Sequence, residues 1–151
     1  MKRTKTVTVT SVFSAPPDEI WERLTRVETL QYIAAPFASF SPVDPDKEMV
    51  WREGETSQFR LRIFGFLPVG VHTIQVCRFD YASYTIDTQE GNKSVPIWNH
   101  RITISQAGKN ASRYTDDVEL GAGWLTGVVY IWSKMFYQHR QRRWVKLLEK
   151  S

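Results

Sequence analysis

The chain has 151 residues, of which 42% are hydrophobic and 24% are charged, as in an ordinary globular protein. This composition excludes a disordered, collagen-like or coiled-coil chain, and the single cysteine, Cys77, excludes an intrachain disulfide and a cysteine-based zinc cluster. The net charge is +4, and the excess cations gather towards the C-terminal end without any nucleic-acid recognition motif. We therefore expect one domain over residues 1–151 and no nucleic-acid partner.

Neither a secretory signal nor a membrane-spanning segment is expected. The uncharged stretch at residues 120–133 is too short and too mixed in polarity to span a bilayer. The basic start of the chain is followed by alternating Val and Thr rather than by an apolar segment. These features predict a cytoplasmic location and no stable membrane insertion.

The first elements are predicted to be a strand and two short helices. Residues 6–13 alternate β-branched Thr and Val, which is typical of a strand. Pro16–Pro17, followed by the acidic Asp18–Glu19, is a helix-start signal. A second short helix is predicted from Val27 to Ile33, and it ends before Pro36.

The middle of the chain is predicted to be a series of strands joined by short turns. Strand patterns separated by Asp, Asn and Gly occur at residues 37–41, 56–64, 71–79, 84–89, 95–105 and 112–120. Such short connections between consecutive strands require an antiparallel sheet. The turn at residues 65–70 is apolar, and three roles stay open for it: a lid at a cavity mouth, a homodimer contact, or a cap on the core.

One long helix is predicted over residues 124–150, which contain no proline. Its predicted buried face consists of Leu125, Val128, Val129, Trp132, Met135, Phe136, His139 and Leu147. A helix of this length can cross a small sheet and cover one of its faces. The elements together predict an α+β fold, with a curved antiparallel sheet of about seven strands wrapped around the C-terminal helix and two short helices after the first strand.

Six segments spread over nearly the whole chain carry a family resemblance: residues 7–9, 15–21, 64–72, 98–100, 114–116 and 136–144. With this order of elements, the chain resembles the helix-grip fold of the START-like, Bet v 1-like (SRPBCC) superfamily, in its polyketide cyclase/dehydrase-like branch. The resemblance implies an apolar ligand, such as a lipid or a polyketide-like aromatic molecule, held between the sheet and the long helix. It does not select among the carriers, cyclases and dehydratases of the superfamily.

Strand alternation places His100 and Asp116 on the inward, apolar faces of two neighbouring strands. If the hairpin between them centres on Gly108, His100 lies directly opposite Asp116, within reach of a hydrogen bond. The same argument for the preceding hairpin, centred on Asn92, places Tyr84 beside His100. The sequence therefore predicts a buried polar row, Tyr84–His100–Asp116.

This row has a catalytic and a structural interpretation. In the first, His100 is a general base or acid, Asp116 orients it, and Tyr84 donates a hydrogen bond, as proton abstraction beside a carbonyl requires. In the second, the pair stiffens the sheet and offers a ligand one polar anchor. The structural interpretation is favoured, because the row lacks a nucleophile or second acid.

A ligand cavity is predicted because a single helix over a curved sheet tends to leave a gap. The predicted ligand-binding residues are Phe59, Leu61, Tyr84, Trp98, His100, Tyr114, Asp116, Trp124, Trp132 and Phe136, with Trp124 near the rim. His72 shares the parity of Ile74 and Val76 and is also expected to face inward. The three histidines lie far apart in the sequence without metal-ligand spacing, so neither a metal site nor a cofactor is predicted.

Three functions stay open at this point. The first is binding of a small hydrophobic molecule with one polar end, anchored by His100 and Asp116. The second is a cyclase or dehydratase type of enzyme with His100 as the base. The third is a protein-interaction module with a filled core, which contacts its partner through the basic C-terminal helix or the turn at residues 65–70.

Overall fold

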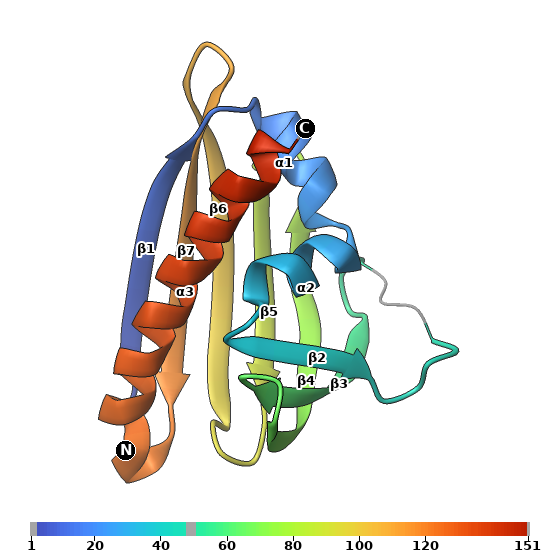
Figure 1. The fold of residues 1–151 in the computed structure, drawn as a ribbon, viewed down its shortest axis with the longest axis vertical. Helices are drawn as coiled ribbons and strands as arrows, with labels where there is room; N and C mark the ends of the chain where they lie inside the picture. Colours follow the sequence, from blue (N-terminus) through green and yellow to red (C-terminus); the bar gives the residue numbers. More distant parts are fainter. Residues whose placement is uncertain (1–2, 48–50, 151) are drawn as a thin grey trace.

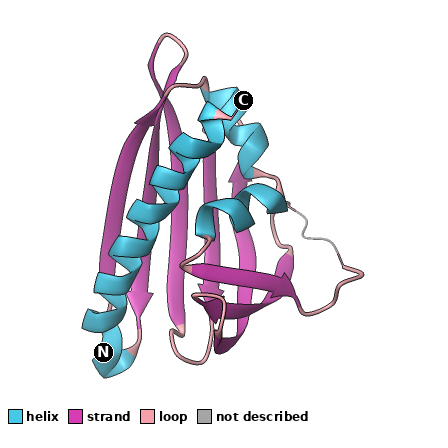
Figure 2. Cartoon of the chain, viewed as in Figure 1, coloured by secondary structure: helices cyan, strands magenta, loops and turns pink. Residues whose placement is uncertain are grey.

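The computed structural model describes residues 3–47 and 51–150, and it has the predicted α+β, helix-grip architecture (Figures 1 and 2). Its elements are β1 (Lys5–Phe13), α1 (Pro17–Leu24), α2 (Val27–Ala34), β2 (Ala38–Pro42), β3 (Thr56–Ile63), β4 (Leu67–Asp80), β5 (Thr85–Gly91), β6 (Ile97–Gly108), β7 (Ala111–Gly121), the 3₁₀ helix η1 (Gly123–Leu125) and α3 (Thr126–Glu149). The prediction of the fold class is confirmed.

The seven strands form one antiparallel sheet in the order β1-β7-β6-β5-β4-β3-β2. In Figure 1, α3 runs diagonally over β1, β7 and β6, and the two short helices lie beside it. The first strand, β1, pairs with the last strand, β7, at one edge of the sheet. Helix α3 packs against β1 at this edge. The concave face of the sheet is thereby covered by all three helices.

Local sequence signals explain the first two elements. In β1, Val7 and Phe13 turn inward and are each 1% exposed, whereas Thr8 and Thr10 face outward and bond Asp117 and Thr115 of β7. Helix α1 begins with proline at its first position, and acidic residues occupy its first turn. Both features favour a helix N-terminus, because proline has no amide hydrogen to leave unpaired and the helix dipole attracts negative charge.

The register of two predicted hairpins is wrong by a few residues. In β6 and β7, His100 lies opposite Val118 and Ile102 lies opposite Asp116, because the chain turns at residues 109–110 and a bulge follows Gln106. The shift in this hairpin is two residues, and a two-residue shift leaves every side chain on its own face. His100 and Asp116 therefore still point into the same interior.

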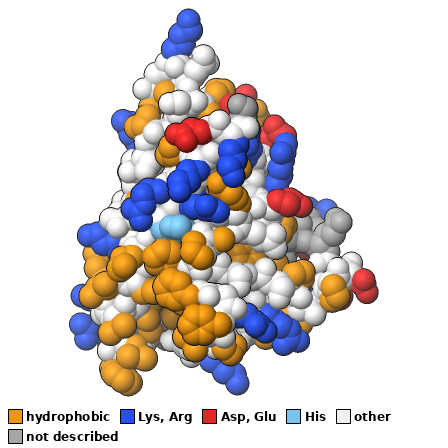
Figure 3. All heavy atoms as spheres, viewed as in Figure 1, with side chains coloured by type: hydrophobic (Ala, Val, Ile, Leu, Met, Phe, Trp, Pro, Cys, Tyr) orange, Lys and Arg blue, Asp and Glu red, His pale blue; other side chains and the backbone are white. Residues whose placement is uncertain are grey.

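The predicted buried face of α3 is also wrong in part. Val128 and Met135 are 66% and 52% exposed, while the buried side chains are Thr126, Ser133, Phe136, Tyr137, Gln141 and Trp144. The helix is rotated by its large aromatic residues and by Gln141, which bonds the sheet, so its inward face is more polar than a count of hydrophobic residues suggests. Figure 3 shows hydrophobic side chains over the N-terminal half of α3 and cationic side chains over its C-terminal half.

The core has two parts along α3. At one, which we name the closed end, α1 and the last turns of α3 cover the sheet with Phe13, Ile20, Leu24, Ile86, Ile104, Tyr114 and Trp144. At the other, which we name the cavity end, the core consists of Val7, Ala34, Ala38, Leu61, Val95, Trp98, Val118, Leu120, Phe136 and Tyr137. The cavity end adjoins the candidate site.

Candidate ligand cavity

A cavity of about 90 Å³ lies between the sheet, α2 and the inward face of α3. Its sheet side is formed by inward residues of β3 to β6, including Phe59, Leu61, Ile74, Ile86, Trp98 and Ile102. Leu30 and Ala34 of α2 and Trp132 and Phe136 of α3 close it from the helical side. Because one buried water needs about 10–15 Å³ of such space, the cavity has room for roughly six to nine waters, or for a small ring compound.

Four titratable side chains on adjacent strands form the polar wall of this region, which we name the carboxylate–histidine row: His72, Glu90, His100 and Asp116. His72 Nε2 lies 2.8 Å from Glu90 Oε1, and His100 Nε2 lies 2.6 Å from Asp116 Oδ1. His100 Nδ1 lies 3.7 Å from Glu90 Oε2, which joins the two pairs. The row thus crosses the sheet from β4 to β7, with its members in alternating acid and imidazole order.

The row is buried, and burial alone would favour its neutral forms. Instead, hydrogen bonds from His100 and His72 outweigh burial at Glu90 and hold its pKa well below the ordinary value. Burial opposes the charge on Asp116 as well, but the hydrogen bond from His100 lowers its pKa overall. Burial would lower the pKa of His100, yet its bonds to Asp116 and Glu90 raise it overall. These directions favour an imidazolium held between two carboxylates.

Helix α3 secures one end of the row. Gln141 Nε2 donates to Asp116 Oδ2 at 3.0 Å and to the Val9 carbonyl at 2.7 Å, and its own carbonyl accepts from the Ser11 hydroxyl at 2.5 Å. Asp116 is 0% exposed, so this amide fixes a carboxylate that water does not reach. The contacts link α3 to β1 and β7 in one network.

Two residues that precede Gln141 on α3, Tyr137 and Arg140, complete the cavity wall. Trp98 Nε1 donates to the Tyr137 hydroxyl at 2.9 Å, and the Tyr137 ring meets the His100 ring edge-on. The Arg140 guanidinium lies 5.1 Å from the centre of the Tyr137 ring and 5.7 Å from that of Phe136. The two rings hold a cation at the wall of an otherwise apolar space.

Six of the predicted ligand-binding residues line the cavity: Phe59, Leu61, Trp98, His100, Trp132 and Phe136. Asp116 lies behind His100 and bonds it from outside the cavity. Tyr114 is instead packed between Phe13 and Trp144 at the closed end, and Trp124 is 88% exposed on η1. Neither of these two aromatics is placed to touch a ligand in the cavity.

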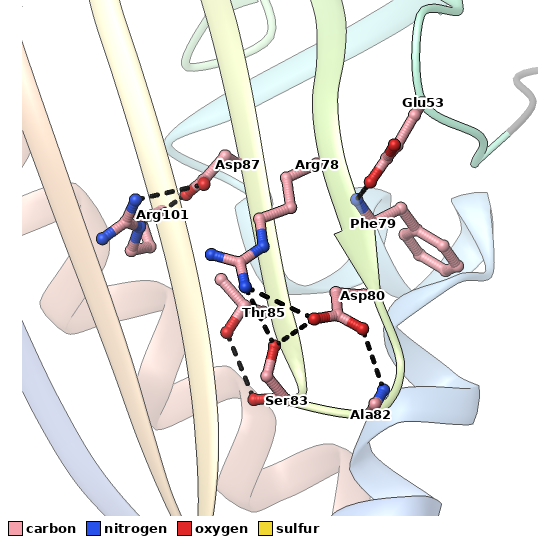
Figure 4. A network of polar contacts seen from close by, with 9 residues as sticks. All are labelled: Glu53, Arg78, Phe79, Asp80, Ala82, Ser83, Thr85, Asp87 and Arg101. Carbon is pink, nitrogen blue, oxygen red and sulfur yellow. Dashed lines mark hydrogen bonds and ion pairs between the residues drawn. The ribbon is translucent and has the colours of Figure 1, made fainter.

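Tyr84 lies outside the row, contrary to the prediction. Residues 81–84 form the turn between β4 and β5, and the Asp80 carboxylate accepts hydrogen bonds within it (Figure 4). Tyr84 ends this turn with φ of 50°, and its hydroxyl donates to Asp18 at 2.5 Å. That hydrogen bond raises the pKa of Tyr84 to about 12. Thr88, rather than Tyr84, lies opposite His100.

Sequence reasoning missed Glu90, Arg140 and Gln141. The strand containing Glu90 was predicted to end at residue 89, although Glu90 has the same parity as Ile86 and Thr88, which was the available signal. No such signal marked Arg140 and Gln141, because a basic, glutamine-rich helix segment ordinarily faces solvent. The inward orientation predicted for His72 is confirmed by its 6% exposure. Cys77 is exposed and free.

The curved sheet gripping a long helix defines the fold class of START-like and Bet v 1-like proteins. A START superfamily protein from Mycobacterium smegmatis matches with a TM-score of 0.72 at 15% identity, over 96% of this chain and 97% of that one. Norcoclaurine synthase from Thalictrum flavum, in complex with dopamine and hydroxybenzaldehyde, matches with a TM-score of 0.71 at 12% identity, over 99% and 88% of the two chains. At these identities the likeness establishes the fold alone.

Within this class, the chain belongs to the family described as Domain of unknown function (DUF8410), whose model matches residues 11–148. Comparison with curated protein sequences gives no match. Among the described residues, no helix is both long and apolar enough to cross a membrane, and no cluster of His, Cys, Asp and Glu has the geometry to hold a metal ion.

Proposed function

We propose that this protein binds a small, mainly apolar ligand, aromatic or polyketide-like, in the cavity between the sheet and α3. The observation that carries the proposal is an apolar cavity with one polar wall, since ligand sites are typically apolar spaces with a few placed polar groups. Trp98, Trp132 and Phe136 supply flat aromatic walls. The match to norcoclaurine synthase, a protein of the same fold in complex with two small aromatic molecules, supports the same ligand size.

The polar wall supports binding better than it supports catalysis by His100. One ring nitrogen of His100 faces Asp116 and the other faces Glu90, so neither is directed at a ligand. A general base also needs a neutral imidazole, whereas both carboxylates raise the pKa of His100. The proposed role of His100 and Asp116 is therefore to anchor and polarise the cavity wall rather than to remove a proton.

The proposal is tested by titrating the protein with polycyclic aromatics, poly-β-ketone mimics, sterols and fatty acyl compounds. Trp51, Trp98 and Trp132 line the cavity, so intrinsic fluorescence reports occupancy, and mass spectrometry of the recovered compound reports turnover. We expect saturable quenching by an aromatic compound that is returned intact. Conversion that disappears in His100→Ala would replace this proposal with the cyclase or dehydratase mechanism.

A cavity-filling variant provides the matched control. Ala38 is 3% exposed and lines the cavity, and Ala38→Leu is expected to weaken binding about tenfold or more, because added volume in a packed site costs about 1–3 kcal/mol. Ala82→Leu makes the same change on an exposed turn and should leave binding unchanged. Equal binding by the two variants, or no quenching by any compound, would overturn the proposal.

A further inference from the structure

Arg140 is a cavity-lining cation with one buried donor that has no partner. Its Nε is buried without a hydrogen-bond partner, and no carboxylate in residues 3–47 and 51–150 forms an ion pair with its guanidinium. Other arginines differ: Arg101 binds Asp87 through two nitrogens, and Arg143 donates to the Tyr32 carbonyl. A buried cationic donor without an acceptor is costly, so a molecule that supplies the acceptor gains that free energy on binding.

The neighbouring carboxylates are already committed. Glu90 accepts from His72 at one oxygen and from Thr88 at the other, and Asp116 accepts from His100 and Gln141. They act on Arg140 only through their charge, which outweighs burial and raises its pKa. Arg140 therefore stays charged, and its buried Nε–H remains without an acceptor.

Tyr137 provides a second donor on the same face of α3, three residues before Arg140. Its hydroxyl oxygen accepts from Trp98, which leaves its own proton to donate, and the side chain lines the cavity. Burial, aided by the charge of Glu90, raises the pKa of Tyr137 well above its usual range, so the hydroxyl stays protonated. Residues three apart on a helix project side by side, and the Arg140 guanidinium lies 5.1 Å from the centre of the Tyr137 ring.

We propose that Tyr137 and Arg140 form an anion subsite and that the ligand is an apolar or aromatic molecule carrying a carboxylate. The planar fork of an arginine matches a carboxylate in a bidentate arrangement, and the Tyr137 hydroxyl adds a third hydrogen bond. The apolar part of the ligand occupies the space lined by Trp98, Trp132 and Phe136. An ammonium ligand fits less well, because the oxygens of Glu90 are already occupied. The inference rests on the proposed function and specifies its ligand class.

Three probes of the same shape test this inference: β-naphthoate, β-naphthamide and β-naphthylmethylamine, each titrated by calorimetry. We expect the acid to bind about tenfold tighter than the amide, because charge-assisted bonds are stronger than neutral ones, and the amine to bind most weakly. Arg140→Gln should reduce the affinity for the acid to that for the amide. It should leave the affinity for the amide unchanged. Tyr137→Phe should weaken binding of the acid by a smaller factor.

Arg142→Gln is the matched control, since Arg142 lies on the same helix, is exposed, and carries the same charge. It should leave the affinity for the acid within about twofold. The anion subsite is wrong if the acid binds no tighter than the amide, or if both arginine variants weaken binding of the acid equally. Either result leaves the proposed binding of an apolar ligand intact. If none of the probes binds, the subsite fails, and the fluorescence panel decides the proposed function separately. The ranking in the unmodified protein tests the inference even if Arg140→Gln does not fold.

Discussion

The closed end and the cavity end of the core use the same sheet and the same helix for different purposes. At the closed end, α3 contributes Trp144, which stacks on Phe13 and packs at a tilt against Tyr114 without exposure to solvent. At the cavity end, about one to two turns earlier, α3 faces the sheet with Tyr137 and Arg140. One end is filled with apolar side chains, and the other retains space and charge.

Stability and ligand chemistry are located at different ends of the core. Apolar burial stabilises a fold without further requirements, whereas buried charges stabilise it only if every member is paired. The carboxylate–histidine row meets that condition within the sheet, whereas Arg140 has no carboxylate partner within the described residues and its Nε is unpartnered. We therefore infer that the closed end carries much of the folding free energy and that the cavity end is arranged for a ligand.

The largest effect is expected from Trp144→Ala at the closed end. Removing a fully buried tryptophan should reduce the free energy of unfolding by about 3–5 kcal/mol, because transfer and cavity costs add. Trp132→Ala at the cavity end should cost only about 1–2 kcal/mol, since that ring is partly exposed and already borders open space. Chemical denaturation measures both, and equal losses would contradict the contrast between the two ends.

A smaller effect is expected from Asp116→Asn in the row. The change leaves a buried imidazolium with one carboxylate fewer and should cost about 2–3 kcal/mol. Asp117→Asn is the control on the outward face, where the carboxylate bonds Thr8, and it should cost about 0.5 kcal/mol or less. A loss at residue 116 no greater than at residue 117 would show that the row does not depend on its charge.

The smallest effect is a pH dependence of stability. Because the pKa of His100 is raised by folding, its contribution is complete below the unfolded value of about 6.5 and is lost as pH rises through the folded value. The pKa values of Glu90 and Asp116 are lowered, so their contributions are lost as pH falls below their unfolded values of about 4. Stability from the row should therefore be greatest between these limits. In His100→Gln, denaturation curves recorded at a series of pH values should lose the alkaline decline; an unchanged decline would assign it to another group.

Much of the fold follows from local patterns. The alternation of Thr and Val defines β1, and the prolines at residues 16, 17 and 36 bound the short helices. The absence of proline after Trp124 allows one long helix, which the structure confirms. Strand ends differ from prediction, most clearly in β4, which starts at Leu67 rather than residue 71. Strand ends depend on which neighbour is available for pairing, and that information lies in other segments of the chain.

The contact between His100 and Asp116 was predicted from parity although the register was wrong by two residues. Parity repeats every second residue along a strand, so it survives such an error, and a long side chain reaches a diagonal neighbour as well as an opposite one. Parity could not place Tyr84 correctly, because Tyr84 lies in the turn at residues 81–84 and not in a strand. Turn length thus determined which residues joined the row.

The α+β class, the order of the elements, and the inward faces of the strands that carry His72, His100 and Asp116 follow from local sequence patterns alone. The rotation of α3 about its axis, the pairing of Glu90 with two histidines, and the half-buried position of Arg140 in the cavity wall depend on tertiary packing. The physical reason is the range of the forces involved. Period and turn chemistry act between residues near in sequence, whereas the rotation of a helix is set by packing and hydrogen bonds to strands more than a hundred residues away, as between Gln141 and Val9.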